Sequence, residues 1–133
     1  MELFGSVDGS GNPALLSRAA KANGLIYTAG LTARDPDGTV PKGIKVQTEM
    51  VFERLESVLK EAGASLRDVM KVNIFVVDLR DLPIMNDVYR EFFPEAAPAR
   101  AMVQVAGLAD RDYLIEIEAI AQDPEWDKGD RGA

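Results

Sequence analysis

The stretch Pro98 to Ala121, PARAMVQVAGLADRDYLIEIEAIA, decides the fold of this chain. Its two halves alternate in side-chain character with a period of two residues, which is typical of β-strands that have two different faces. We therefore predict strands at 98–106 and 113–121, joined by a short polar turn at 108–112. On the first strand, Ala99, Ala101, Val103 and Val105 share one face, and Arg100, Met102 and Gln104 share the other. On the second strand, Ile115, Ile117 and Ala119 lie opposite Glu116 and Glu118.

The residues before this stretch predict a hairpin, two helices and one further strand. Asn23-Gly24 separates two short strand-like runs, 17–22 and 25–29, and both residues tolerate the positive φ angles of a hairpin turn. Residues 44–62 have apolar side chains at helical spacing and end at Gly63, a common helix stop. A strand follows at 69–77, with Met70, Val72, Ile74 and Val76 on one face. A second helix runs to Phe93, with Asp81 as its expected cap and Pro83 in its first turn.

This order of elements predicts an α+β fold, a two-layer α/β sandwich. Two helices can cover only one face of a mixed sheet of five to six strands. We expect a single domain over residues 1–121 and a charged C-terminal tail, 122–133, that is partly disordered. Residues 1–13 are expected to be a flexible start or a short edge strand.

The uncovered face of the sheet is the expected location of the function. We expect it to pack against other copies of the chain and to enclose a polar pocket, because it is both polar and partly apolar. The residues placed on this face are Lys71, Asn73, Phe75, Arg100, Met102, Gln104, Glu116 and Glu118.

Composition excludes several classes of chemistry. The chain contains no cysteine and no histidine. A thiol nucleophile, a Ser-His-Asp triad and a zinc site with Cys or His ligands are therefore impossible, and we predict no metal. The net charge of −7 opposes nonspecific nucleic-acid binding, which depends on neutralising phosphates with Lys and Arg. No apolar run of about 18 residues is present, so we expect no membrane span, and we expect a cytoplasmic protein.

Several segments together resemble one known family, the RidA family (also called YjgF/YER057c/UK114) of reactive-intermediate imine deaminases. They are NGLIYTAG at 23–30, AGASLRDVMKVNIFVVDL at 62–79, NDVYREFFPE at 86–95, PAR at 98–100 and IEIEAIA at 115–121. The resemblance covers roughly residues 14–121. It implies a chorismate-mutase-like fold and a homotrimer with three sites in the clefts between subunits.

The implied reaction is the hydrolysis of 2-imino acids, such as 2-iminobutanoate and 2-iminopropanoate, to 2-keto acids and ammonium. No cofactor takes part, and the role is repair of metabolite damage. By resemblance, Arg100 matches the arginine that binds the substrate carboxylate, which its planar fork can hold through two hydrogen bonds. Glu116 matches the glutamate that orients the attacking water. Alternation alone does not choose between Glu116 and Glu118. Asn86 matches a family asparagine near the site, and Gly30 matches the glycine of a Ser-Gly motif.

The chain departs from the family pattern at three pocket positions. Leu16 replaces a common tyrosine, Ala29 replaces the serine of the Ser-Gly motif, and Met102 stands where cysteine is frequent. Two hydroxyl groups are thereby lost, which makes the pocket more apolar. Two alternatives to a small-imine deaminase follow. One is a non-catalytic regulatory module that binds a small carboxylate, and the other is a deaminase of a larger pathway-specific enamine such as an aminomuconate.

Overall fold

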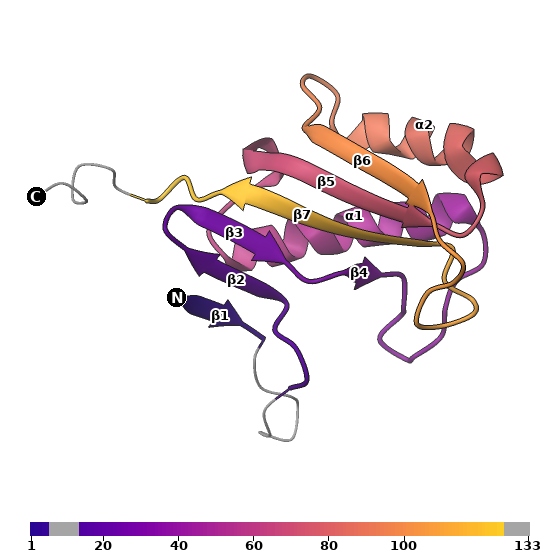
Figure 1. Cartoon of the computed structure of the whole chain (residues 1–133), viewed down its shortest axis with the longest axis horizontal. Helices are drawn as coiled ribbons and strands as arrows, with labels where there is room; N and C mark the ends of the chain where they lie inside the picture. Colours follow the sequence, from indigo (N-terminus) through magenta and orange to yellow (C-terminus); the bar gives the residue numbers. More distant parts are fainter. Residues whose placement is uncertain (6–13, 127–133) are drawn as a thin grey trace, which may run out of the picture.

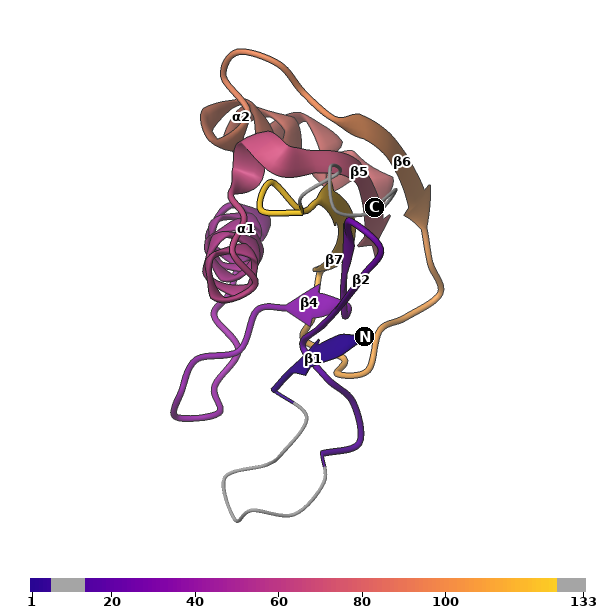
Figure 2. The same ribbon diagram turned by 90° about the vertical axis from the view of Figure 1, so that its left-hand side faces the viewer.

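The computed structural model describes residues 1–5 and 14–126, which form two layers. Two α-helices lie side by side on one face of a mixed seven-stranded sheet, and the other face is left open (Figures 1 and 2). The predicted two-layer α+β architecture is therefore confirmed. In chain order the elements are β1 (Glu2–Phe4), β2 (Ala19–Ala22), β3 (Leu25–Thr28), β4 (Leu31–Thr32), α1 (Ile44–Glu61), β5 (Val69–Val76), α2 (Leu82–Phe92), β6 (Ala99–Gln104) and β7 (Ile115–Gln122). Short 3₁₀ turns at Leu66–Asp68 and Leu79–Asp81 precede β5 and α2.

The sheet is organised around β7, which pairs with three other strands. The strand order is β1-β2-β3-β7-β5-β6, and β4 also pairs with β7, beyond the end of β3. Only β5 and β6 are parallel. The strands predicted at 98–106 and 113–121 are present as β6 and β7, but β5 lies between them, so the two are not hydrogen-bonded neighbours. The seven strands exceed the predicted five to six because β1 and β4, of three and two residues, also join the sheet.

The predicted hairpin is present as β2 and β3. Asn23 and Gly24 have φ angles of 52° and 83°, the left-handed values that a tight two-residue turn requires. The start of the C-terminal tail packs on this turn. The Asp123 amide donates to the carbonyl of Gly24 (2.9 Å), and its carboxylate pairs with Lys21 (3.3 Å). Residues 6–13 and 127–133 lie outside the described residues, and most of the predicted disordered tail falls there.

The end of α1 and the start of α2 are each accompanied by local hydrogen bonds. After α1, the amide of Gly63 donates to Lys60 and the amide of Ala64 to Leu59, which is the Schellman arrangement, with Gly63 at φ 88°. The predicted capping bond from Asp81 to α2 is not made. Instead, the Asp78 side chain accepts from the amide of Arg80, one turn earlier, because a 3₁₀ turn precedes the helix.

The core lies between the helices and the sheet. Phe52 of α1 is fully buried and contacts the rings of Tyr89, Phe92 and Phe93, with ring centroids 5.4–5.9 Å apart. On the sheet, the buried face includes Val72, Ile74 and Val76 of β5 and Ile115, Ile117 and Ala119 of β7. The alternation predicted for β7 is therefore confirmed.

One residue of β5 lies on the other side from its prediction. Met70 is 46% exposed, whereas Val69 is buried. The pairing with β7 shifts between Val69 and Lys71, which is a β-bulge. Because an extra residue in a strand reverses the alternation, Val69 takes the core position that period-two spacing assigned to Met70.

The largest correction concerns β6. Arg100, Met102 and Gln104 are in register with Val72, Ile74 and Val76, which face the helices. Since residues directly opposite each other on paired strands share a face, these three side chains lie on the helix side of the sheet. The prediction that placed them on the open face with Glu116 and Glu118 is wrong. The open face of β6 carries Ala99, Ala101 and Val103 instead, in register with Lys71, Asn73 and Phe75.

Candidate functional site

A break between β3 and β4 shapes the region around Ala29 and Gly30. Both strands pair with β7, but the pairing slips by one residue between Tyr27–Ile120 and Leu31–Ile117. Between these two paired stretches, the Thr28 hydroxyl accepts a hydrogen bond from the amide of Ala119 (3.0 Å). Bulges of this kind re-aim side chains beside functional sites. Here the bulge turns Gly30 toward the side chain of Glu116.

Gly30 leaves the space that Glu116 occupies. A Cβ built on Gly30 would overlap Oε2 of Glu116 and would lie 2.9 Å from its Cδ. The glycine is thus required for close approach rather than for an unusual φ angle. Burial raises the pKa of Glu116, and the neighbouring Glu118 raises it further. Glu118 is held by the Asn73 side-chain amide (3.3 Å). The raised pKa favours Glu116 as the carboxylate that takes up a proton, whereas Glu118 is engaged by Asn73.

A cleft of ≈ 300 Å³ opens beside the bulge. Three residues predicted for the pocket, Leu16, Ala29 and Gly30, line it together with Leu31 and Thr32. The remaining wall comes from residues that the sequence did not point to, namely Arg18, Arg54, Ser57, Val58 and Glu61. Arg54, Ser57, Val58 and Glu61 lie on one side of α1 at helical spacing. That spacing alone does not show which other element this side of the helix faces.

Arg100 lies at the other end of the sheet, on edge strand β6. Its guanidinium carbon is 4.8 Å from the centre of the Tyr89 ring, a cation–π contact. Burial raises the pKa of Tyr89, and the positive charge of Arg100 opposes this rise. Within the described residues Arg100 is exposed and forms no ion pair. Its fork is therefore available to a carboxylate.

Asn86 and Met102 come from α2 and β6, the same two elements that carry Tyr89 and Arg100. Asn86 precedes Tyr89 by three residues on α2, so the two share one side of the helix. Its Oδ1 atom is buried and has no hydrogen-bond partner among the described residues. An unpaired buried acceptor is unusual in a folded protein. Met102 is half-buried and packs against the core from β6.

The predicted site residues therefore form two groups in one chain. Leu16, Ala29, Gly30 and Glu116 surround the bulge, whereas Arg100, Asn86 and Met102 lie around β6 and α2. Glu116 points to the open face of the sheet and Arg100 to the helix face, with β5 between their strands. One copy of the chain does not bring Arg100 and Glu116 together.

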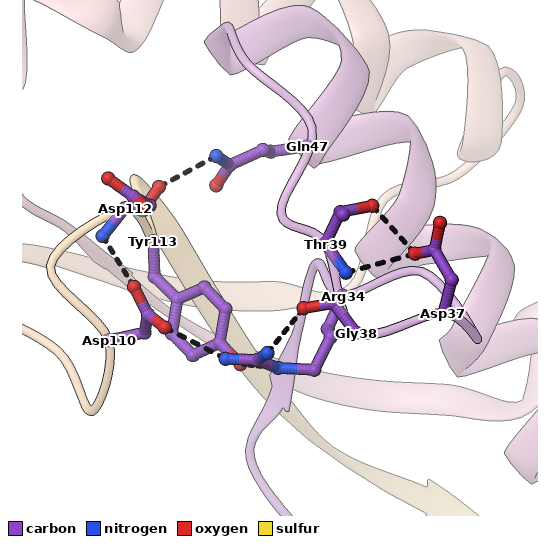
Figure 3. Close-up of polar contacts among 8 residues, drawn as sticks. All are labelled: Arg34, Asp37, Gly38, Thr39, Gln47, Asp110, Asp112 and Tyr113. Atoms are coloured by element: carbon purple, nitrogen blue, oxygen red, sulfur yellow. Dashed lines mark hydrogen bonds and ion pairs between the residues drawn. The ribbon is translucent and has the colours of Figure 1, made fainter.

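A polar network holds the loops that flank the first group (Figure 3). The Arg34 side chain donates to the Tyr113 hydroxyl (2.9 Å) and to the Asp110 carboxylate (2.8 Å). Gln47 is 1% exposed, and its amide donates to the carbonyls of Pro41 and Asp112, both at 2.9 Å. Its oxygen accepts from the amide of Leu114 (2.8 Å). The network ties the loop before α1 to the segment that enters β7, and so fixes the strand that carries Glu116.

No helix within residues 1–5 and 14–126 is both long and apolar enough to span a membrane.

Comparisons with known proteins give a consistent result. The sequence model of the family described as Endoribonuclease L-PSP matches residues 12–123. A RutC family protein of Pyrococcus abyssi is 49% identical over 107 residues, which are 79% of this chain and 84% of that protein. The 3-aminoacrylate deaminase RutC of Acinetobacter baylyi is 42% identical over 105 residues, 77% of this chain and 82% of that protein.

A solved structure agrees with these sequence matches. The crystal structure of RidA from an Antarctic Psychrobacter is similar to this fold, with a TM-score of 0.78 and 36% sequence identity. The alignment covers 88% of this chain and 98% of that one. The matched length, the identities and the shared fold show that the chain belongs to the Endoribonuclease L-PSP family, which is the RidA (YjgF/YER057c/UK114) family of proteins.

Proposed function

We propose that this protein is an imine or enamine deaminase, which hydrolyses reactive 2-imino acids to 2-keto acids and ammonium without a cofactor. The observation that carries the proposal is Arg100, an exposed guanidinium that is stacked on Tyr89 and has no carboxylate partner in the described part of the chain. Such a group is suited to hold the carboxylate of a small imino acid in two hydrogen bonds. Relatives named as deaminases support the same class of reaction.

The proposed reaction needs one held carboxylate, one positioned water and one proton acceptor. With the substrate carboxylate on Arg100, water attacks C2 of the iminium group, and Glu116 takes the proton that the water loses. A carbinolamine forms. Glu116 then returns the proton to nitrogen, and as the C2–N bond breaks it takes the proton of the carbinolamine hydroxyl, whose oxygen becomes the keto oxygen. That proton passes to the departing ammonia, so the keto acid and ammonium leave and Glu116 is again a carboxylate. The raised pKa of Glu116 makes it a better proton acceptor than an ordinary, well-hydrated carboxylate.

We further propose that the complete site lies between two copies of the chain in a homotrimer. Arg100 and Glu116 are on opposite faces of one sheet, so a neighbouring copy has to supply one of them. The open face also exposes apolar side chains that favour contact with another chain, with Tyr27 and Val103 each 50% exposed. Removal of reactive imines as metabolite repair in the cytoplasm fits this chemistry.

The test is imine hydrolysis. An amino-acid oxidase or a threonine dehydratase generates imines in place, and semicarbazide traps what remains. We expect the protein to reduce trapping, and we expect Arg100→Ala to abolish this effect while size-exclusion chromatography still shows a trimer. Arg90→Ala is the matched control, because Arg90 is also an exposed arginine but is already paired with Asp87 (3.1 Å). Full activity in Arg100→Ala would show that the assignment of Arg100 is wrong.

Leu16 and Ala29 favour a second candidate, a regulatory module that binds a small carboxylate without turnover. Both line the cleft and carry no hydroxyl group that could help to orient water. Arg100-dependent binding of carboxylates without acceleration of imine hydrolysis would support this candidate. The same two residues are compatible with a larger, more apolar enamine substrate, such as an aminomuconate. Although the family description includes the word endoribonuclease, the net charge of −7 opposes contact with RNA.

A further inference from the structure

The ring that Arg100 contacts is a buried part of the core. Tyr89 of α2 is 5% exposed, and its ring lies against the rings of Phe52 (centroids 5.5 Å apart) and Phe93 (4.9 Å). The guanidinium carbon of Arg100 is 4.8 Å from the centre of the same ring. Because its neighbours confine the Tyr89 ring, it can hold the guanidinium in place before any ligand binds.

The hydroxyl group of Tyr89 is not explained by this packing. The other rings of the cluster are phenylalanines, Phe52, Phe92 and Phe93. The Tyr89 hydroxyl oxygen is buried and has no hydrogen-bond partner among the described residues. A buried hydroxyl without a partner costs free energy, so phenylalanine would serve the core better at this position.

Asn86 repeats the pattern one helical turn earlier. It shares one side of α2 with Tyr89, and its Oδ1 atom is also buried and unpaired. Of the three buried side-chain polar atoms that lack a partner within the described residues, two therefore belong to this side of α2. Both can accept a hydrogen bond, and the arginine that contacts Tyr89 carries only donors.

Strand β6 is fixed against α2, whereas the Arg100 side chain is exposed. The Gln104 side-chain oxygen accepts from the amide of Leu79 (2.9 Å), in the 3₁₀ turn that precedes α2. Met102 packs against the core from the same strand. Arg100, two residues earlier, is exposed. The strand thus keeps the guanidinium over α2 and leaves its outer edge open to a ligand.

We propose that Tyr89 is a positioning residue for substrate binding: its ring carries the Arg100 guanidinium, and its hydroxyl accepts an N–H group of Arg100 when the opposite edge of the fork binds a carboxylate. Asn86 Oδ1 is the second acceptor for the same guanidinium. A carboxylate takes two N–H groups of an arginine in parallel bonds and leaves the others free. The inference rests on the proposed function, in which Arg100 holds the substrate carboxylate.

The first experiment measures imine hydrolysis and stability in Tyr89→Phe. An amino-acid oxidase forms the imine from 2-aminobutyrate. We expect KM to rise about tenfold, the effect of one hydrogen bond to a charged group. We expect kcat to stay unchanged, because Arg100 binds the carboxylate equally in the ground state and the transition state. The melting temperature of the ligand-free protein should not fall, since the lost hydroxyl has no partner there. Asn86→Leu removes the second acceptor and should raise KM in the same way.

Phe92→Leu is the matched control for damage to the core. Phe92 packs on Phe52 in the same cluster (5.4 Å), and the cation–π contact of Arg100 is with Tyr89 instead. We expect Phe92→Leu to lower the melting temperature and to leave KM unchanged. Tyr89→Leu, which removes the ring as well, should raise KM further than Tyr89→Phe. An unchanged KM in Tyr89→Phe, or a rise that Phe92→Leu reproduces, would overturn the inference and leave the proposed deaminase intact.

A binding measurement separates the inference from the proposed function. If no imine is hydrolysed, the proposed function fails, but thermal stabilisation by 2-oxobutanoate still reports carboxylate binding. Stabilisation of the wild type that is weaker in Tyr89→Phe and absent in Arg100→Ala supports the positioning role. Equal stabilisation of the wild type and Tyr89→Phe, or no stabilisation of the wild type, refutes it.

Discussion

Replacement of Gly30 by alanine should move the Glu116 side chain and leave the stability of the fold almost unchanged. The φ angle of Gly30 is not in the left-handed region, so the backbone accepts alanine without strain. The added Cβ, however, would overlap the Glu116 carboxylate, whose Cδ would be 2.9 Å away. The substitution therefore acts on one side chain rather than on the strand.

The magnitude follows from this distance. Carbon atoms in contact prefer separations of about 3.5–4.0 Å, so the Glu116 carboxyl carbon has to move by about 0.6–1.1 Å. A misplacement of about 1 Å in a catalytic arrangement can cost about 100-fold in rate. We expect kcat for imine hydrolysis to fall by about 10- to 100-fold. Since the displaced atoms are the end of a flexible side chain, the free energy of unfolding should fall by less than about 1 kcal/mol.

Steady-state imine hydrolysis and urea unfolding measure the two effects separately. Gly107→Ala is the matched control, because its added Cβ meets no atom within 4 Å and its φ angle is unexceptional. The pH–rate profile adds a third measurement. A carboxylate displaced toward water loses part of the burial that raises the pKa of Glu116, so the acidic limb of the profile should shift to lower pH.

Two results would refute this reasoning. If Gly30→Ala kept more than half of the wild-type kcat, Glu116 would not act from its position beside Gly30. Gly30→Ala can also be added to the Glu116→Gln variant. If it lowered kcat by the same factor there as in the wild type, its effect would not depend on Glu116.

Two further predictions concern stability. Gln47→Leu removes three hydrogen bonds from the buried Gln47 side chain to the backbone of Pro41, Asp112 and Leu114. At about 1 kcal/mol each, urea unfolding should show a loss of about 3 kcal/mol, and a loss below about 1 kcal/mol would mean that the loops are held by other contacts. The raised pKa of Glu116 means that the folded protein binds this proton more tightly than the unfolded chain, so stability falls as pH rises through the pKa. Glu116→Gln should therefore increase the free energy of unfolding at about pH 7 and change it little at about pH 4, and a pH-independent effect would contradict this.

Much of the fold was predictable because its signals are local. Helical spacing identified α1, and Gly63 marked its end, since a left-handed residue there satisfies the last carbonyl groups. Asn23-Gly24 identified the hairpin, because its turn needs two positive φ angles. The apolar face of β7 was also readable, since every second residue from Ile115 to Ala121 is buried.

The face of β6 was not predictable in this way. Alternation shows which residues of one strand share a side, but the side that meets the helices depends on the register with the neighbouring strand. On β6 the small residues Ala99 and Ala101 looked like a core face beside Arg100. The register with β5 places Arg100 on the helix side, over Tyr89.

The same distinction between local signals and long-range contacts applies to the candidate site. The sequence by itself determined the fold class, the helices, the strand that carries Glu116 and, by resemblance, the identity of Arg100. Only the tertiary structure decided that Gly30 makes room for Glu116 and that Arg100 and Glu116 lie on opposite faces. The physical reason is that these are contacts between segments far apart in the chain. They depend on pairing, on a one-residue slip and on burial, and none of these is encoded by the period of a single strand or helix.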